Sequence, residues 1–354
     1  MNGHPTLRRI PAWLPRVISN RPPVRSTMFA TVLVAVLLLG LLVAGCGGDA
    51  TTTTVAPSTT AAPSTTIAPE TTLAPTTTVA AFPVTVTDDN GDAATINAAP
   101  TRIVSTAPAG TETLFALGLG DKVVGVTSLD DYPPEVADIA KVGDFMTNTE
   151  AVMALSPDLV VGYSGNEEAL TPVKAAGCPV IIFNPATLDG IYANISLLGT
   201  ATGTSAKAEE LIASIKAEIK AVTDTTSLLA TRPKVFYAVD NTLWTCGPGS
   251  FVDELLALVN AENVGSAQPD AAGVQAYYQF SPEQLLAADP DIVLLPNTAY
   301  ASADEFTGDA RFASLRAVKE GHVFMVNDIL ITRPGARIGQ GLKTLAEAVH
   351  PGAL

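Results

Sequence analysis

Residues 205–229 read SAKAEELIASIKAEIKAVTDTTSLL, a run that is rich in Lys and Glu and contains neither Gly nor Pro. Its apolar side chains recur at the spacing of one helical face, at Leu211, Ile215, Ile219 and Val222. An Arg-Pro pair at 232–233 ends the pattern, because a residue before proline disfavours the helical conformation. The run therefore predicts one uninterrupted helix over 205–231, which would extend over roughly 30 Å or more.

Short apolar, β-branched runs lie on both sides of this helix. They are RIVS (102–105), VVGVT (123–127), DLVVGY (158–163) and PVIIF (179–183) before it, and KVFYAV (234–239), DIVLLP (291–296) and HVFMVN (322–327) after it. Near-continuous apolar runs are typical of parallel strands covered on both faces, and helical patterns alternate with them here. The predicted fold class is α/β, with two similar Rossmann-like lobes (82–204 and 232–354) joined by one long rigid helix.

The two predicted lobes share a sequence motif. Residues 150–161 read EAVMALSPDLVV and residues 283–294 read EQLLAADPDIVL. The matching pairs are Glu150 and Glu283, Ala154 and Ala287, Pro157 and Pro290, and Asp158 and Asp291. The long separation favours two similar lobes over an array of short repeats. Ligands of two-lobed α/β proteins bind in the cleft between the lobes, so we expect the site there.

The amino terminus has the pattern of a secretory signal. Five arginines precede an apolar run at 28–44, and no acidic residue precedes Cys46. This run is shorter than the roughly 20 residues that a membrane-spanning helix needs. Small residues at 43–45 before Cys46 form the lipobox of bacterial lipoproteins, so we predict a signal peptide at 1–45 and a lipid on Cys46. The alternative is an uncleaved signal anchor with a chance cysteine.

Thr, Ala, Pro and Val make up most of the next segment. Such a composition cannot bury enough apolar surface to fold, so we predict that residues 46–81 comprise the lipidated cysteine and a tether. A wall-binding adhesin stalk would have the same composition and stays open as an alternative.

Charge and motif content exclude several classes of protein. The formal net charge is −15, and the removal of five arginines with the signal makes the mature chain more acidic still. This charge argues against binding of nucleic acid or anionic lipid surfaces, so we expect membrane contact through the lipid anchor only. The sequence contains no Gly-x-Ser-x-Gly elbow, P-loop or metalloprotease helix motif. We therefore expect neither an enzyme nor a cofactor.

Metal sites and disulfides are also not expected. Only His322 and His350 remain after the signal, too few for a His-rich metal site. Cys178 and Cys246 lie in distant segments, and two free thiols are favoured over a bridge, which an extracellular location would still permit.

Four segments resemble the periplasmic-binding domain for cobalamin and ferric siderophores. They are residues 100–136, 142–163, 247–264 and 333–351, so the resemblance covers essentially all of the chain after residue 82. It implies a class III substrate-binding fold with limited closure, and an extracytoplasmic, monomeric lipoprotein of an ABC importer. In cobalamin receptors one glutamate on each lobe docks on the permease, and the matching positions are Glu150 and Glu283. Both also follow N-cap residues, Asn148 and Ser281, where a first-turn acid stabilises the helix dipole.

The resemblance also implies candidate ligand residues. Aromatic side chains that line the cleft of cobalamin receptors correspond here to Phe145, Tyr163, Trp244 and Tyr277. Leu129 and small residues replace other aromatic positions, which is a departure from that pattern. Arg333 and Arg337 flank the loop before the last helix and could bind the anionic groups of a ferric siderophore or haem. A corrinoid is slightly favoured, and a ferric siderophore or haem is the alternative.

Overall fold

The computed structural model describes residues 81–266 and 276–354. The predicted signal peptide, Cys46 and nearly all of the predicted tether lie outside the described residues. Within the described part, helices are either too short or too polar to cross a membrane.

The amino-terminal lobe is built on a five-stranded parallel sheet in the order β5-β4-β3-β6-β7. Its strands are β3 (Ile103–Ser105), β4 (Val123–Val126), β5 (Ala140–Lys141), β6 (Leu159–Tyr163) and β7 (Val180–Phe183). Its helices are α1 (Pro108–Ala116), α2 (Thr149–Ala154), α3 (Glu167–Ala175) and α4 (Leu188–Thr202), with 3₁₀ turns at Gly120–Lys122 and Pro134–Asp138. An antiparallel hairpin precedes the sheet, made of β1 (Val84–Thr87) and β2 (Ala93–Ile96).

The carboxy-terminal lobe has a four-stranded parallel sheet in the order β10-β8-β12-β13. Its strands are β8 (Lys234–Tyr237), β10 (Glu262–Asn263), β12 (Ile292–Pro296) and β13 (Val323–Val326). A separate antiparallel pair is formed by β9 (Trp244–Cys246) and β11 (Tyr277–Gln279). The helices are α6 (Phe251–Leu258), α7 (Pro282–Ala288), α8 (Asp304–Thr307), α9 (Arg316–Glu320), α10 (Asp328–Thr332) and α11 (Ile338–Val349), with a 3₁₀ turn at Ala310–Phe312. The predicted α/β class with parallel sheets is confirmed.

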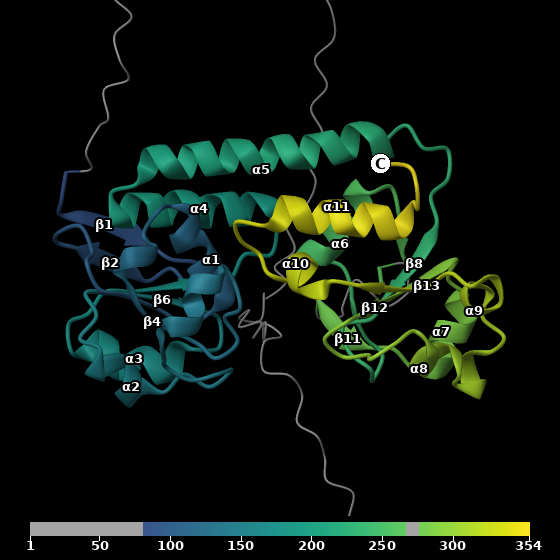
Figure 1. The fold of residues 1–354 in the computed structure, drawn as a ribbon, viewed down its shortest axis with the longest axis horizontal. Coiled ribbons are helices and arrows are strands. Elements are labelled where there is room, and N and C mark those ends of the chain that lie inside the picture. The colour runs from purple at the N-terminus through teal and green to yellow at the C-terminus, as the bar shows by residue number, and fades with distance from the viewer. Residues whose placement is uncertain (1–80, 267–275) are drawn as a thin grey trace, which may run out of the picture. The chain divides into compact units, whose positions relative to one another are not determined.

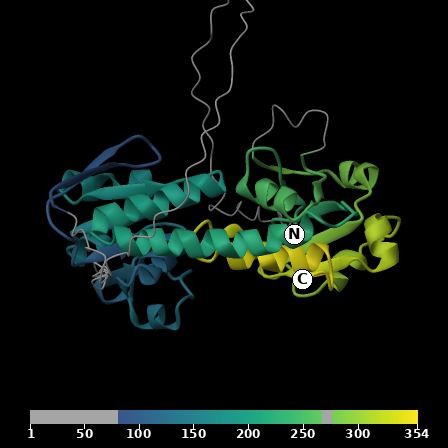
Figure 2. The ribbon, with the colours of Figure 1, turned by 90° about the horizontal axis from the view of Figure 1, so that it is seen from above.

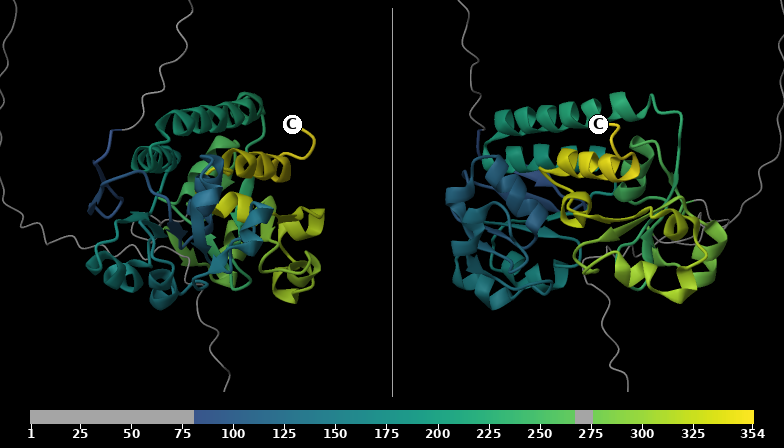
Figure 3. Two further views of the ribbon diagram at one scale, coloured as in Figure 1. Left: turned by 60° about the vertical axis from the view of Figure 1, so that its left-hand side comes forward. Right: turned by 45° about the vertical axis from the view of Figure 1, so that its right-hand side comes forward.

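A single long helix, α5 (Ser205–Thr226), joins the two lobes (Figures 1 and 2). It ends at Thr226, five residues before the predicted end at 231. It packs on α4 and α11, and α11 runs beside it in both views of Figure 3. Gly199 lets α4 approach α5 closely, because a Cβ at this position would lie 2.5 Å from the Cβ of Ala208.

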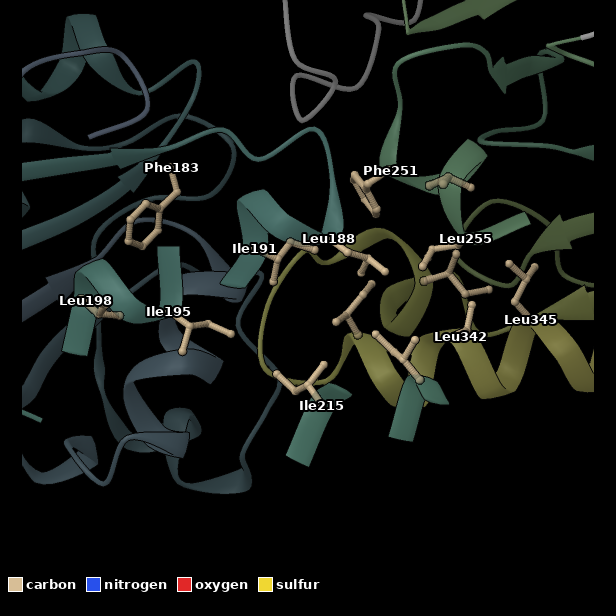
Figure 4. Close-up of a cluster of buried hydrophobic side chains, with 14 of the residues drawn as sticks. Phe183, Leu188, Ile191, Ile195, Leu198, Ile215, Phe251, Leu255, Leu342 and Leu345 are labelled. Carbon is tan, nitrogen blue, oxygen red and sulfur yellow. The ribbon is translucent and has the colours of Figure 1, made fainter. Parts of the chain in front are cut away.

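One apolar cluster continues from the first lobe into the second (Figure 4). The residues labelled in the figure are Phe183, Leu188, Ile191, Ile195, Leu198, Ile215, Phe251, Leu255, Leu342 and Leu345. They belong to β7, α4, α5, α6 and α11. The lobes therefore share one hydrophobic layer on the side of the long helix.

The repeated motif occupies equivalent places in the two lobes. Asp158 follows α2, and its carboxylate accepts the N–H of Arg102 at 2.9 Å, next to the start of β3. Asp291 follows α7, and its carboxylate accepts the N–H of Lys234 at 2.8 Å, at the start of β8. Each aspartate thus ties its own strand to the adjacent parallel strand, so the sequence match reflects a shared structural unit.

Both described cysteines are free thiols. Cys178 is partly buried and Cys246 is fully buried. Burial raises the pKa of Cys178 to about 11 and that of Cys246 to about 12, so neither is a thiolate at neutral pH. Within residues 81–266 and 276–354, His, Cys, Asp and Glu side chains do not gather into a group of three that could hold a metal ion.

Candidate functional site

A cleft of about 510 Å³ lies between the lobes, at the carboxyl ends of their strands. From the first lobe it is lined by residues that end or follow all five strands of the sheet: Thr106–Ala109, Leu129, Asp131, Asp144–Met146, Tyr163–Asn166 and Asn184–Ala186. The carboxyl ends of parallel strands meet at one edge of a sheet, which is where open α/β folds bind ligands. This volume falls within the range of small-molecule sites, roughly 300–1,000 Å³.

The second lobe supplies the opposite wall. Its lining residues are Gly249–Phe251, Ala276, Tyr277, Thr298, Asp328, Ile329 and Thr332–Pro334. They follow β9, β12 and β13 or begin β11. Both lobes therefore face the cleft with residues that follow strands of their parallel sheets, and the second lobe adds residues next to the β9–β11 pair.

Two tyrosines from opposite lobes lie in this cleft. Tyr163 is the last residue of β6, and Tyr277 is the first residue of β11 and only 6% exposed. Among the described residues, none hydrogen-bonds either hydroxyl. Burial raises the pKa of both phenols well above the usual range, and each then stays neutral at physiological pH. The hydroxyls are thus neutral groups without a protein partner in the described part.

Phe145 stands at the rim of the cleft, beside Met146. The side chains are 43% and 74% exposed, which is unusual for large apolar groups. A tight turn presents them: Gly143 has a left-handed φ of 125°, and the Asp144 carboxylate accepts the N–H of Met146 at 2.8 Å. The turn therefore holds an apolar pair at the mouth of the cleft.

Trp244, the fourth aromatic expected in the lining, does not line the cleft. It begins β9, whereas the cleft lies beyond the other end of that strand, at Gly249–Phe251. Its side chain is partly buried against the main apolar cluster. The sequence interpretation placed Trp244 in the cleft because it lies in the expected segment, but strand direction takes it away from the site.

Arg333 and Arg337 are both engaged by acids of the other lobe. Arg333 lines the cleft, and its Nη1 donates to Glu112 Oε1 at 2.9 Å and to Asp131 Oδ1 at 2.5 Å. Arg337 is outside the lining and forms a two-point contact with Glu112, from Nε at 2.8 Å and Nη2 at 2.5 Å. The sequence analysis did not identify Glu112 as a functional residue. The one indication was an acidic residue within the largely apolar helical segment TETLFALG (111–118).

The charges on the cleft wall are mostly negative. Asp131, Asp144 and Asp328 are the acidic lining residues among those described, and Arg333 is the one base. Asp328 is buried, which raises the pKa of its carboxyl group, and it accepts the Thr298 hydroxyl at 2.7 Å. Residues 267–275, outside the described part, read AQPDAAGVQ and contain no basic side chain. The described cleft therefore offers no unpaired cation to a ligand.

Comparison with known proteins decides the family. Residues 103–330 match the family model described as periplasmic binding protein. The chain belongs to the periplasmic binding protein family. Members of this family are transport substrate-binding proteins rather than enzymes.

Three relatives of this periplasmic binding protein are informative. The Bacillus subtilis (strain 168) protein named uncharacterized ABC transporter substrate-binding lipoprotein YvrC is 33% identical over 331 residues, which cover 91% of this chain and 97% of that protein. A cobalamin-binding protein of Halobacterium salinarum is 30% identical over 284 residues, covering 76% of this chain and 75% of that protein. The apo periplasmic haem-binding protein RhuT of Roseiflexus sp. RS-1 aligns with a TM-score of 0.65 at 30% identity, covering 72% of this chain and 99% of RhuT. The class III fold is confirmed.

The two predicted docking acids of this periplasmic binding protein are exposed first-turn residues. Glu150 follows the N-cap Asn148 in α2, and Glu283 follows the N-cap Ser281 in α7. Contacts with its own backbone N–H and with Ser281 lower the pKa of Glu283, which keeps it charged. Figure 1 shows α2 and α7 on the side of the molecule away from α5, one on each lobe.

Proposed function

We propose that this protein is the substrate-binding lipoprotein of an ABC importer and that it captures a corrinoid outside the cell in the cleft between its lobes. The proposed aromatic contacts are Phe145, Tyr163 and Tyr277. Arg333 is also a proposed contact, because its side chain lines the cleft. Large aromatic faces bury much area at low entropic cost, which suits a broad, partly apolar macrocycle. The names of the B. subtilis and H. salinarum relatives support the transport role and the ligand class, respectively.

The negative charge of the cleft wall is the observation that favours one ligand over the other. An anionic siderophore or the propionates of haem would meet three carboxylates in the cleft wall. The one arginine of the wall, Arg333, is already paired with two acids and has no free charge to offer. Like charges at short range in a partly desolvated site oppose binding. An uncharged macrocycle meets no such opposition, so this observation favours the corrinoid.

A haem or ferric-chelate receptor is the second candidate. The observation in its favour is the pair of Tyr163 and Tyr277 hydroxyls, which lack protein partners among the described residues. A tyrosine oxygen can ligate haem iron. The name of RhuT supports the same candidate. An adhesin on a Thr/Pro stalk would explain the tether but gives no role to the cleft.

Titration of the purified protein with cyanocobalamin, haem and ferric siderophores tests the proposal. We expect saturable binding of cyanocobalamin at micromolar concentration or below, measured by calorimetry and native mass spectrometry. Added salt should change this affinity little, because the contacts are apolar and uncharged. Absence of binding to cyanocobalamin, together with salt-sensitive binding of haem or a siderophore, would replace the corrinoid by the second candidate.

Glu150 and Glu283 are the proposed docking points for basic side chains of the permease. One exposed acid on each lobe, both on the side away from α5, gives a partner two contacts that straddle the cleft. The protein is proposed to act as a monomer without catalytic activity, held at the outer face of the cell membrane by a lipid.

Replacing Cys46 by serine tests the anchor. Because the lipid is attached through the cysteine thiol, Cys46→Ser should release the protein into the medium or leave the unprocessed precursor. Fractionation and gel mobility of the variant measure this, with Cys178→Ser as the control that keeps the anchor. A Cys46→Ser variant that fractionates and migrates like the wild type would show that the lipoprotein assignment is wrong.

A further inference from the structure

Residues 333–337, which we name the RPGAR clip, join α10 to α11 and lie against α1 of the other lobe. Gly335 allows this approach, because a Cβ there would lie 3.0 Å from the carbonyl oxygen of Ala109 and 3.3 Å from Oγ1 of Thr113. The two arginines at the ends of the clip therefore stand on either side of a backbone contact between the lobes.

Glu112 of α1 receives both arginines. Its side chain is 2% exposed, and the side chains of Arg333 and Arg337 are each 16% exposed. Oε1 accepts Arg333 Nη1 at 2.9 Å and Arg337 Nη2 at 2.5 Å, while Oε2 accepts Arg337 Nε at 2.8 Å. These charge-assisted hydrogen bonds to one buried carboxylate fix both guanidinium groups in position.

Two further hydrogen bonds of Arg333 also reach the first lobe. Nη1 donates to Asp131 at 2.5 Å and Nη2 donates to the carbonyl oxygen of Leu129 at 3.1 Å. Arg337 lies over the ring of Tyr132, with 4.0 Å from Cζ to the ring centroid. Two carboxylates thus balance two guanidinium groups, and the network as a whole is neutral.

We propose that Glu112 determines the charge selectivity of the cleft. By holding the guanidinium group of Arg333 at the cleft wall, it keeps an arginine that could bind an anion from presenting free positive charge to a ligand. Asp131 assists, since it binds Arg333 on the cleft wall itself. The inference rests on the proposed function only in taking this cleft as the ligand site, and it holds for any ligand that binds there.

The same contacts predict what the loss of the negative charges of Glu112 and Asp131 would do. With Glu112 as glutamine and Asp131 as asparagine, Arg333 keeps neutral hydrogen-bond partners but loses both charged ones. Its guanidinium already lines the cleft, so no movement is needed for it to meet a carboxylate ligand. The cleft would then acquire an anion site from residues that it already contains.

Calorimetric titration of the purified full chain with citrate measures this effect, with triethyl citrate as the uncharged probe. Glu112→Gln combined with Asp131→Asn should lower the Kd for citrate about tenfold or more, and added salt should reverse the gain. The Kd for triethyl citrate should stay unchanged. Adding Arg333→Gln to the double variant should remove the gain, because Arg333 is the group that binds the anion.

Two single variants provide a matched comparison. Asp131→Asn and Asp144→Asn remove the same charge from two exposed aspartates of the cleft wall, but only Asp131 is paired with Arg333. We expect a gain in citrate affinity of about threefold for Asp131→Asn and a clearly smaller gain for Asp144→Asn, which removes only the like-charge repulsion. Equal effects of the two would show that only net charge matters and would overturn the role of the network.

A folded double variant whose citrate affinity matches that of the wild type would also overturn the proposal. If the double variant does not fold, the two single variants still decide whether acids paired with Arg333 set the anion affinity, since both positions are exposed. None of these measurements uses a corrinoid, so a failure of the corrinoid assignment and a failure of this inference are separate results.

Discussion

Reversal of both Glu150 and Glu283 to lysine is expected to abolish uptake while ligand affinity stays at the wild-type value. Both acids are exposed on first turns and neither lines the cleft, so their reversal leaves the binding site intact. The proposed partner is basic, and like charges placed directly at two contacts prevent the complex from forming. Uptake of labelled ligand by cells, and calorimetry of the purified variant, measure the two properties separately.

The matched control reverses one other exposed first-turn acid on each lobe. Glu168 in α3 and Asp304 in α8 meet this description. If the acids at 150 and 283 serve only their helix dipoles, both double variants should lose stability alike and transport in proportion to the folded protein. Wild-type uptake by the folded Glu150→Lys, Glu283→Lys variant would rule out docking through these residues.

Tyr277→Ala is expected to weaken ligand binding by about 30-fold or more, since the loss of a large buried contact at a site costs about 2 kcal/mol. The ring is buried, lies on the cleft wall and faces the lobe that carries Tyr163. Trp244→Ala should change the affinity much less, because this side chain packs on the core and not on the cleft. Calorimetry gives the affinities, and thermal unfolding shows how much of each effect is loss of fold.

Tyr277→Phe separates the two candidate ligands. For a corrinoid held by aromatic surface, Phe keeps the ring and should bind nearly as tightly as the wild type. For an iron complex ligated through the phenol oxygen, Phe should lose as much affinity as Ala.

A larger effect of Trp244→Ala than of Tyr277→Ala would contradict the placement of the site.

Local sequence patterns predicted the framework well, because they report burial and chain direction. The helical spacing around Ile215 predicted α5, and the apolar run at 179–183 predicted β7. The Pro-Asp motif predicted two lobes of one build, which Asp158 and Asp291 confirm through their equivalent hydrogen bonds. Such patterns act within a few residues of each other, so a single sequence displays them.

Contacts between distant segments were not predictable in the same way. Arg333 and Glu112 are 221 positions apart, and no local spacing indicates that they meet. The pairing of β9 with β11 likewise depends on tertiary structure, and it turns Trp244 away from the cleft while it places Tyr277 in it. A sequence thus indicates which residues could bind a ligand, but partners across the lobes decide which of them are free to do so.

The apolar layer that continues through α4, α5, α6 and α11 also governs how the chain must fold. The two lobes share part of their core, because Phe183 of the first lobe and Leu345 of the second belong to the same cluster although they are far apart in the sequence. Contacts of such long sequence separation form late and slowly, after the loop between them has closed. We therefore expect the junction of the lobes to assemble after the separate sheets, and the cleft to take its final shape when the carboxy-terminal helix docks.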